Sequence, residues 1–283
     1  METIDLTYGT VGYRAAGPED AASPPVVFVH GFLVDGSLWS GVADRLAARG
    51  IRSYAPDWPL GSHRLPLPDA DQTPRGVARQ ILSFLEALDL TDVTLVGNDT
   101  GGALCQYVVD TDAGRVGRLV LTNCDAFDTF PPFPFNVVFN LLKGTRRMRS
   151  VLQPMRLRAV RHSPLGFGLL ARRFDPAQSR AWLEPALTDA AVRSDAVRFL
   201  QAVDPSELND VSSRLSRFDG PVRLVWGTRD RSFTPRLGRR LARAFGGAEF
   251  IEVPEARTFV PLDAPQALAD QIAAIGDAAS ASA

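Results

Sequence analysis

Hydrophobic and polar positions follow an alternating order along most of this chain. Residues 2–16 have the pattern of two short strands, and the apolar run at 26–30 is typical of a strand covered on both faces of a sheet. Further strands are predicted at 51–55, 92–97, 118–122, 221–226 and 248–253. Helical spacing of apolar residues is found at 37–49, 74–88, 100–110, 234–245 and 265–275. Strands that alternate with helices predict a parallel sheet whose ligands bind at the carboxyl ends of the strands.

The alternation stops between about 128 and 212. This stretch has the pattern of helices separated by proline and glycine, and it lies between two strands of the predicted sheet. We therefore expect a core formed by 1–127 and 213–283. The segment 128–212 is expected to be inserted as a helical lid over the active site.

Composition limits the class of protein. The chain has 283 residues, of which 45% are hydrophobic and 22% are charged, as in ordinary globular proteins. A net charge of -1 gives no reason to expect nucleic-acid binding, and no apolar run reaches the roughly 18 residues of a membrane span. The three histidines and two cysteines lack metal-ligand spacing, so no metal is predicted, and no motif predicts a cofactor. We expect a cytoplasmic protein that acts on a small molecule, with no prediction of its oligomeric state.

The most informative motif is a turn that joins a strand to a helix. It contains Gly97-Asn98-Asp99-Thr100-Gly101, with a small residue on each side of a central aspartate. A turn this tight excludes side chains beside it and strains the backbone of Asp99, whose carboxylate then stands clear of the sheet. A carboxylate in that position can attack carbon by displacement and form an ester, which water must hydrolyse. The alternative is a helix N-terminus that Asp99 merely caps.

On this motif and the order of elements, the chain resembles the α/β-hydrolase superfamily over nearly its whole length. The central aspartate is similar to that of the branch with haloalkane dehalogenases and soluble epoxide hydrolases. The resemblance implies a mostly parallel, eight-stranded sheet flanked by helices. It also implies that Asp99 is the nucleophile and that the backbone N–H groups of Phe32 and Thr100 form an anion hole. His30 is implied to brace the loop before Phe32.

The family's triad acid follows a late strand of the sheet. In this chain Asp230 follows the strand that ends at Trp226. Asp125 follows the preceding strand, where some dehalogenases keep their acid, and is the second candidate. An ordinary turn aspartate is the alternative for Asp230.

The family's catalytic histidine has no counterpart here. The residues around its position match the family, but Thr258 occupies the position itself. A threonine hydroxyl does not accept a proton usefully near neutral pH. His63 follows the strand at 51–55 at the carboxyl edge of the sheet, and it is the candidate replacement; a surface loop position is the alternative. His162, among arginines of the lid, is expected at the surface.

Two absences bear on the substrate. Soluble epoxide hydrolases polarise the oxirane oxygen with lid tyrosines, but all four tyrosines lie outside the predicted lid. Dehalogenases hold the leaving halide with a tryptophan and an asparagine, where this chain has Thr100 and Phe32. Trp182 of the lid could compensate, or could belong to the core. The motifs therefore specify neither activity.

Phenylalanine and proline are concentrated where the lid begins. Phe127, Phe130 and Phe133 belong to this stretch, which continues to Phe139. These side chains suit the wall of an apolar pocket, with Trp182 as a further candidate, and packing of the lid on the core is the alternative. The stretch favours a hydrophobic small molecule as substrate.

The predicted function is hydrolysis of a hydrophobic small molecule through an ester on Asp99. One alternative is a lyase, isomerase or cyclase in which Asp99 is a general base, since that chemistry needs no histidine to activate water. The other alternative is an inactive ligand-binding homologue. The intact turn and Asp230 count against it.

Overall fold

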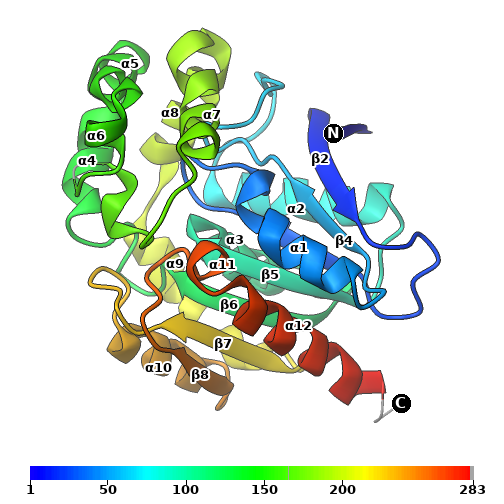
Figure 1. Cartoon of the computed structure of the whole chain (residues 1–283). Helices are drawn as coiled ribbons and strands as arrows, with labels where there is room; N and C mark the ends of the chain where they lie inside the picture. The colour runs from blue at the N-terminus through cyan, green and yellow to red at the C-terminus, as the bar shows by residue number, and fades with distance from the viewer. Residues whose placement is uncertain (165, 281–283) are drawn as a thin grey trace.

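Within the residues described by the computed structural model, 1–164 and 166–280, the chain folds around one eight-stranded sheet (Figure 1). Its order is β1-β2-β4-β3-β5-β6-β7-β8. The strands are β1 (Glu2–Leu6), β2 (Gly9–Ala16), β3 (Val26–Val29), β4 (Ser53–Pro56), β5 (Val93–Asp99), β6 (Val116–Cys124), β7 (Val222–Gly227) and β8 (Glu249–Val253). β2 pairs antiparallel with β1 and β4, and the remaining pairs are parallel. The predicted mostly parallel sheet is confirmed.

Helices cover both faces of this sheet. On one face α1 (Ser40–Ala47) packs against α12 (Pro265–Ser280), and on the other α2 (Pro74–Ala87) packs against α3 (Thr100–Thr111) (Figure 1). α10 (Pro235–Ala244) packs against β7 and β8. The layers enclose a core of completely buried side chains in the central strands, which include Phe28, Val96 and Leu121. Both faces of these strands are therefore apolar, as their continuous hydrophobic runs predict.

Local sequence explains where the helices begin. At the start of α2, the side chain of Thr73 accepts a hydrogen bond from the Gly76 backbone N–H, and Pro74 occupies the first turn, where no N–H is needed. α10 begins in the same way, with Thr234 as the cap. The predicted helix at 37–49 differs, because Asp35 caps a short 3₁₀ helix at Gly36–Trp39 before α1 begins.

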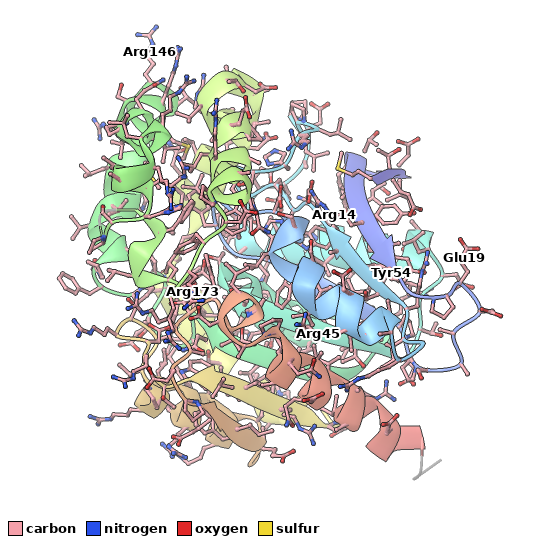
Figure 2. All side chains as sticks on the ribbon, viewed as in Figure 1. Arg14, Glu19, Arg45, Tyr54, Arg146 and Arg173 are labelled. Carbon is pink, nitrogen blue, oxygen red and sulfur yellow. The ribbon has the colours of Figure 1, made fainter. Side chains whose placement is uncertain are left out.

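The segment between β6 and β7 is helical, as the sequence predicts. Its helices are α4 (Phe135–Leu142), α5 (Thr145–Leu152), α6 (Arg158–Arg161), α7 (Pro176–Thr188), α8 (Ala190–Ala202) and α9 (Pro205–Ser212), with 3₁₀ helices at Gln153–Arg156, Phe167–Leu169 and Leu215–Arg217. Helices α4–α8 stand together at one end of the sheet, whereas α9 packs against α3 of the core (Figure 1). The side chain of Arg146, on α5, points into solvent at the outer end of this group (Figure 2).

None of the helices in the described part of the chain combines the length and the hydropathy needed to cross a membrane.

Candidate active site

The turn at Asp99 has the strained geometry that its sequence predicts. β5 ends at Asp99 and α3 begins at the next residue, and Asp99 has φ 55° and ψ −132°. A positive φ is rare for a residue other than glycine and is found where the surrounding structure enforces it. A Cβ at Gly101 would lie 2.1 Å from the carbonyl oxygen of Val29, and one at Gly97 would lie 2.7 Å from the Cα of Gly102. The small residues on both sides are therefore required for the turn to pack against β3 and α3.

The carboxylate of Asp99 lies inside the predicted anion hole. It accepts hydrogen bonds from the backbone N–H groups of Thr100 and Phe32. Gly31 closes the other side, since a Cβ there would lie 2.1 Å from Asp99 Oδ2. Burial raises the pKa of Asp99 to about 7, and the two N–H donors limit that rise. Near neutral pH the group is therefore divided between its ionised and protonated forms.

His30 fixes the loop that carries the Phe32 N–H. Its Nδ1 donates to the Gly31 carbonyl oxygen at 2.9 Å, and its Nε2 accepts from the Trp58 backbone N–H at 2.8 Å. Burial lowers the pKa of His30 to about 4, so the ring is neutral at neutral pH. Both ring nitrogens bond to backbone, in agreement with the bracing role expected for this residue.

Asp230 is held by donors on every side. Its Oδ2 accepts from Thr258 Oγ1 at 2.7 Å and from Asn123 Nδ2 at 3.0 Å. Its Oδ1 accepts from the backbone N–H groups of Ser232 and Phe233, at 2.8 and 3.0 Å. Burial nevertheless raises its pKa. Thr258 thus occupies the position beside Asp230 where the resemblance places a histidine, and its hydroxyl bonds to that carboxylate.

Asp125 lies in a different environment from Asp230. It directly follows β6, and the residue before it, Cys124, pairs across the strands with Asp99. The carboxyl of Asp125 is 1% exposed, and neither of its oxygens has a hydrogen-bond partner among the described residues. Burial and the charge of Asp99 raise the pKa of Asp125 well above the ordinary range, and the nearby Thr100 hydroxyl acts in the opposite direction. Its surroundings therefore favour the protonated form of Asp125.

The structure corrects the prediction for His63. The ring is buried rather than on the surface, and its Nε2 lies 3.1 Å from Asp195 Oδ2 on α8. Its Nδ1 accepts from the Gly61 backbone N–H at 3.4 Å. His63 does not line the cavity that contains Asp99, so it does not serve as the base there. Its position at the edge of the sheet was predicted correctly, but its partner lies on the inserted helices.

An apolar cavity of about 190 Å³ lies against Asp99. That is below the roughly 300–1,000 Å³ typical of ligand pockets, so it suits a small molecule. Core loops form its floor, and the inserted segment forms its walls through α4, α5 and the 3₁₀ helix at 167–169. The described residues that line it are Phe32, Leu33, Asp99, Thr100, Asp125, Pro131, Pro132, Pro134, Phe135, Val138, Phe139, Leu142, Val151, Leu152, Met155, Pro164, Gly166, Phe167 and Leu170.

The four predicted pocket residues do not line this cavity. Phe127 and Phe130 are buried, and the guanidinium of Arg240 lies 3.7 Å above the ring of Phe127. Phe133 is 75% exposed. Trp182 is completely buried, and its Nε1 donates to Ser37 Oγ. The Pro-rich stretch does form a wall, but through Phe135, Phe139 and three prolines.

Two asparagines of the site were missed by the sequence analysis. Asn123 donates to Asp230, and its Oδ1 accepts from the Gly227 backbone N–H at 2.6 Å. Asn98 donates to the Thr258 carbonyl oxygen at 2.7 Å. The available signal was an amide inside an otherwise apolar strand, since a buried amide must find partners.

Histidine is absent from the described residues that line the cavity or bond to Asp230. Across residues 1–164 and 166–280, no three His, Cys, Asp or Glu side chains are grouped so as to hold a metal ion.

Comparison with known proteins agrees with this fold. The model of the alpha/beta hydrolase family matches residues 26–271. A haloalkane dehalogenase of Mycobacterium bovis is 29% identical over 76% of this chain and 70% of its own length. A 2-hydroxy-6-oxononadienedioate/2-hydroxy-6-oxononatrienedioate hydrolase of Dechloromonas aromatica is 26% identical over 79% of this chain and 76% of its own. An uncharacterised protein of Mycobacterium tuberculosis is 30% identical, but the match covers 55% of this chain and 45% of that relative, less than half its length.

Solved structures show the same architecture. A haloalkane dehalogenase from Bradyrhizobium elkani superposes with a TM-score of 0.79 over 98% of each chain, at 18% identity. An alpha/beta hydrolase fold protein from Burkholderia ambifaria has a TM-score of 0.79 over 96% of each chain, at 23% identity. The family match spans most of the chain, and the fold agrees with it: the protein belongs to the alpha/beta hydrolase family.

Proposed function

We propose that this protein hydrolyses a small apolar molecule through a covalent ester on Asp99. The observation that carries the proposal is the position of the Asp99 carboxylate. It accepts hydrogen bonds from the Thr100 and Phe32 N–H groups, and it faces the apolar cavity. One carboxylate oxygen attacks a saturated carbon of the substrate, and the leaving group departs. The resulting ester keeps its carbonyl oxygen beside the two N–H groups, which stabilise the oxyanion when water attacks the ester.

The named relatives support this proposal without defining the substrate. The relatives include a haloalkane dehalogenase and hydrolases of 2-hydroxy-6-oxononadienedioate, so their names cover more than one class of substrate. The cavity of this protein is lined mainly by Phe, Pro, Leu and Val side chains. An apolar lining favours an uncharged hydrophobic substrate over a dicarboxylic acid.

A non-hydrolytic reaction with Asp99 as general base is the second candidate. It is favoured by one observation, the pKa of about 7, which suits proton transfer at neutral pH. Such a reaction would use the Thr100 and Phe32 N–H groups to stabilise an oxyanion of the substrate. In this structure the carboxylate of Asp99 itself accepts hydrogen bonds from both N–H groups. Because these donors are already positioned on Asp99, they favour the covalent mechanism.

An inactive binding protein accounts for fewer of the observations. A positive φ at Asp99 and carboxyl groups buried beside it each destabilise the fold. A protein that only binds an apolar ligand gains nothing from either.

The test is alkylation of Asp99 by 1-bromohexane, a small apolar electrophile whose leaving group needs no proton. We expect intact-protein mass spectrometry to show a mass gain of one hexyl group, located on Asp99 by peptide mapping. The rate of alkylation should rise with pH through about 7, because the ionised carboxylate is the nucleophile.

Asp99→Ala should remove the adduct, and Asp128→Asn is the matched control, since Asp128 is 78% exposed beside Arg240. Absence of any adduct on Asp99 in the folded wild-type protein, for bromoalkanes and epoxides alike, would reject the covalent mechanism.

A further inference from the structure

Asp125 is the feature of the site that the covalent mechanism has not used. It is a carboxyl group with both oxygens buried and without hydrogen-bond partners. Leaving such a group unsatisfied costs about 1–3 kcal/mol, so natural proteins keep one where it serves a function. Gln106 bonds to the backbone carbonyl of Asp125 at 2.8 Å, which fixes the backbone and leaves the carboxyl unbonded.

Among the side chains that line the cavity, Asp125 is the best candidate for a proton donor. Among the described lining residues, polar side chains belong to Asp99, Thr100 and Asp125 alone. Of the two carboxyls, Asp99 is the one favoured to ionise, because two N–H groups stabilise its carboxylate, whereas neither oxygen of Asp125 has such a donor. The Thr100 hydroxyl is far less acidic than a carboxylic acid. One carboxylate and one carboxylic acid therefore face the same apolar space, the arrangement with which paired carboxyls divide nucleophilic and acid roles.

The same lining discriminates between leaving groups. A departing halide needs several N–H donors to hold its charge. Apart from the two N–H groups already bonded to Asp99 and the single hydroxyl of Thr100, the side chains of the described lining residues are apolar or carboxylic. The oxygen of an opening epoxide instead becomes a strongly basic alkoxide and needs a proton as the carbon–oxygen bond breaks.

We propose, building on the covalent mechanism above, that Asp125 protonates the oxygen of a small apolar epoxide and then activates the hydrolytic water. The carboxylate of Asp99 attacks an oxirane carbon, the carbon–oxygen bond breaks, and the Asp125 proton moves to the oxygen. The products of this step are a 2-hydroxyalkyl ester of Asp99 and an Asp125 carboxylate.

The second step regenerates both groups. The Asp125 carboxylate accepts a proton from water as the water oxygen attacks Cγ of Asp99, and the oxyanion forms beside the Thr100 and Phe32 N–H groups. The tetrahedral intermediate expels the alkoxide of the diol, which takes a proton from Asp125. The proton of the carboxylic acid formed on Asp99 then passes to Asp125, which restores the Asp99 carboxylate and the Asp125 carboxylic acid. Epoxide and water become a vicinal diol. Asp125 serves as acid and then as base, as one carboxyl does in retaining glycosidases, and no histidine is needed.

The experiment compares 1,2-epoxyhexane with 1-bromohexane, two probes of equal chain length that differ in whether the leaving atom needs a proton. Single-turnover mass spectrometry measures the rate at which each alkylates Asp99, and gas chromatography measures the release of 1,2-hexanediol. In Asp125→Asn, an isosteric change, we expect the ratio of the epoxide rate to the bromide rate to fall by about 10²–10⁴-fold. Asp128→Asn should leave the ratio unchanged.

A solvent isotope comparison on the wild-type protein tests the same step without a variant. Alkylation by the epoxide should be slower in D₂O than in H₂O, and alkylation by the bromide should be insensitive. An unchanged ratio in folded Asp125→Asn, or equal insensitivity of both probes to D₂O, would overturn the role of Asp125.

The outcomes also separate this proposal from the one on which it rests. Alkylation of Asp99 by the bromide but not by the epoxide overturns the role of Asp125 and leaves the nucleophile intact. Alkylation by neither probe overturns both.

Discussion

Single residues show how environment divides one side-chain type into different roles. The carboxylate of Asp99 lies beside two N–H donors, and that of Asp230 accepts hydrogen bonds from four donors. Neither carboxyl oxygen of Asp125 has a hydrogen-bond partner among the described residues. Burial raises the pKa of all three carboxyls. Hydrogen bonds then decide which one is fixed in place and which one is free to exchange a proton. Asp230 is the fixed group, and it holds the hydroxyl of Thr258 in place through a hydrogen bond.

Thr258→His should supply a base at the position where the family resemblance predicts a histidine. Asp230 already accepts from the Thr258 hydroxyl at 2.7 Å, so it can accept from an imidazole N–H at the same place. After alkylation by 1-bromohexane, Asp125 keeps its proton, and we expect the hexyl ester of the wild-type protein to persist. The imidazole should speed its hydrolysis by about 10²–10⁴-fold, measured as loss of the adduct mass with time.

Thr258→Val is the matched control, since it removes the hydroxyl and adds no base. It should lower stability by about 1–3 kcal/mol, because Asp230 loses one donor, and it should leave the ester persistent. Equal ester lifetimes in wild-type protein and folded Thr258→His would contradict the prediction.

The sequence predicts part of the residue-scale chemistry. A local motif is sufficient to predict the roles of Asp99, Thr100 and the glycines, because these residues lie within a few positions of one another in the same turn. The unpartnered state of Asp125 could not be predicted in this way, because it depends on what β6, α3 and the inserted helices place around it. Asn123 was missed for the same reason, since its partners lie more than 100 residues away.

At the scale of elements, the loop after β4 is tied to the inserted helices through one buried carboxylate. Asp195 on α8 accepts from the Leu67 backbone N–H at 2.7 Å and from Arg198 at 2.6 Å, and it pairs with His63. Burial alone would raise the pKa of Asp195, but the hydrogen bonds from His63, Leu67 and Arg198 together lower it. The link holds α8 against the core on the far side of the cavity wall.

His63→Ala should therefore destabilise the protein without changing the chemistry at Asp99. Loss of one donor to a buried carboxylate costs about 1–3 kcal/mol, which lowers the Tm by about 2–4 °C per kcal/mol in a protein of this size class. Differential scanning calorimetry measures the shift, and alkylation by 1-bromohexane should keep its wild-type rate and pH dependence. If the alkylation rate fell by an order of magnitude in variant protein that remains folded, His63 would take part in the reaction.

The element scale also explains which sequence predictions failed. Periodicity predicts the strands and most helices, because each pattern is local. His63 and Asp195 are 132 residues apart, so no local pattern pairs them. In the Phe-rich stretch, α4 begins only at Phe135, and its helical spacing turns Phe135 and Phe139 toward the cavity while Phe133 stays outside. The stretch that forms the wall was predictable, and Phe139 belonged to it, but the sequence did not show which of its phenylalanines face the cavity.

Across the whole molecule, the candidate site contains buried carboxyl groups that destabilise the folded state. Burial raises the pKa of Asp57, Asp99, Asp125, Asp230 and Asp263. Three of these carboxyls gather at the carboxyl ends of neighbouring strands β5, β6 and β7. A site assembled this way trades stability for reactivity, which natural enzymes commonly do.

Asp99→Asn should show this trade as a pH-dependent gain in stability. In the unfolded chain Asp99 ionises near its ordinary pKa of 3.8, whereas in the folded protein its pKa is about 7. Between these values the unfolded state binds fewer protons than the folded state, so the stability contributed by wild-type Asp99 is complete below about pH 4 and is lost as the pH rises to about 7. An asparagine side chain does not ionise, so the Asp99→Asn variant does not lose stability in this way as the pH rises.

The difference in Tm between Asp99→Asn and wild type should therefore be small at pH 4 and reach its full value above pH 7. The full value corresponds to on the order of 2–4 kcal/mol, since each unit of pKa shift is worth about 1.4 kcal/mol. Calorimetry from pH 4 to pH 8 measures it, with Asp128→Asn as the exposed control that should follow wild type throughout. A constant difference over this range would mean that Asp99 titrates in the folded protein as it does in the unfolded chain, and that burial at the end of β5 does not tune its carboxylate.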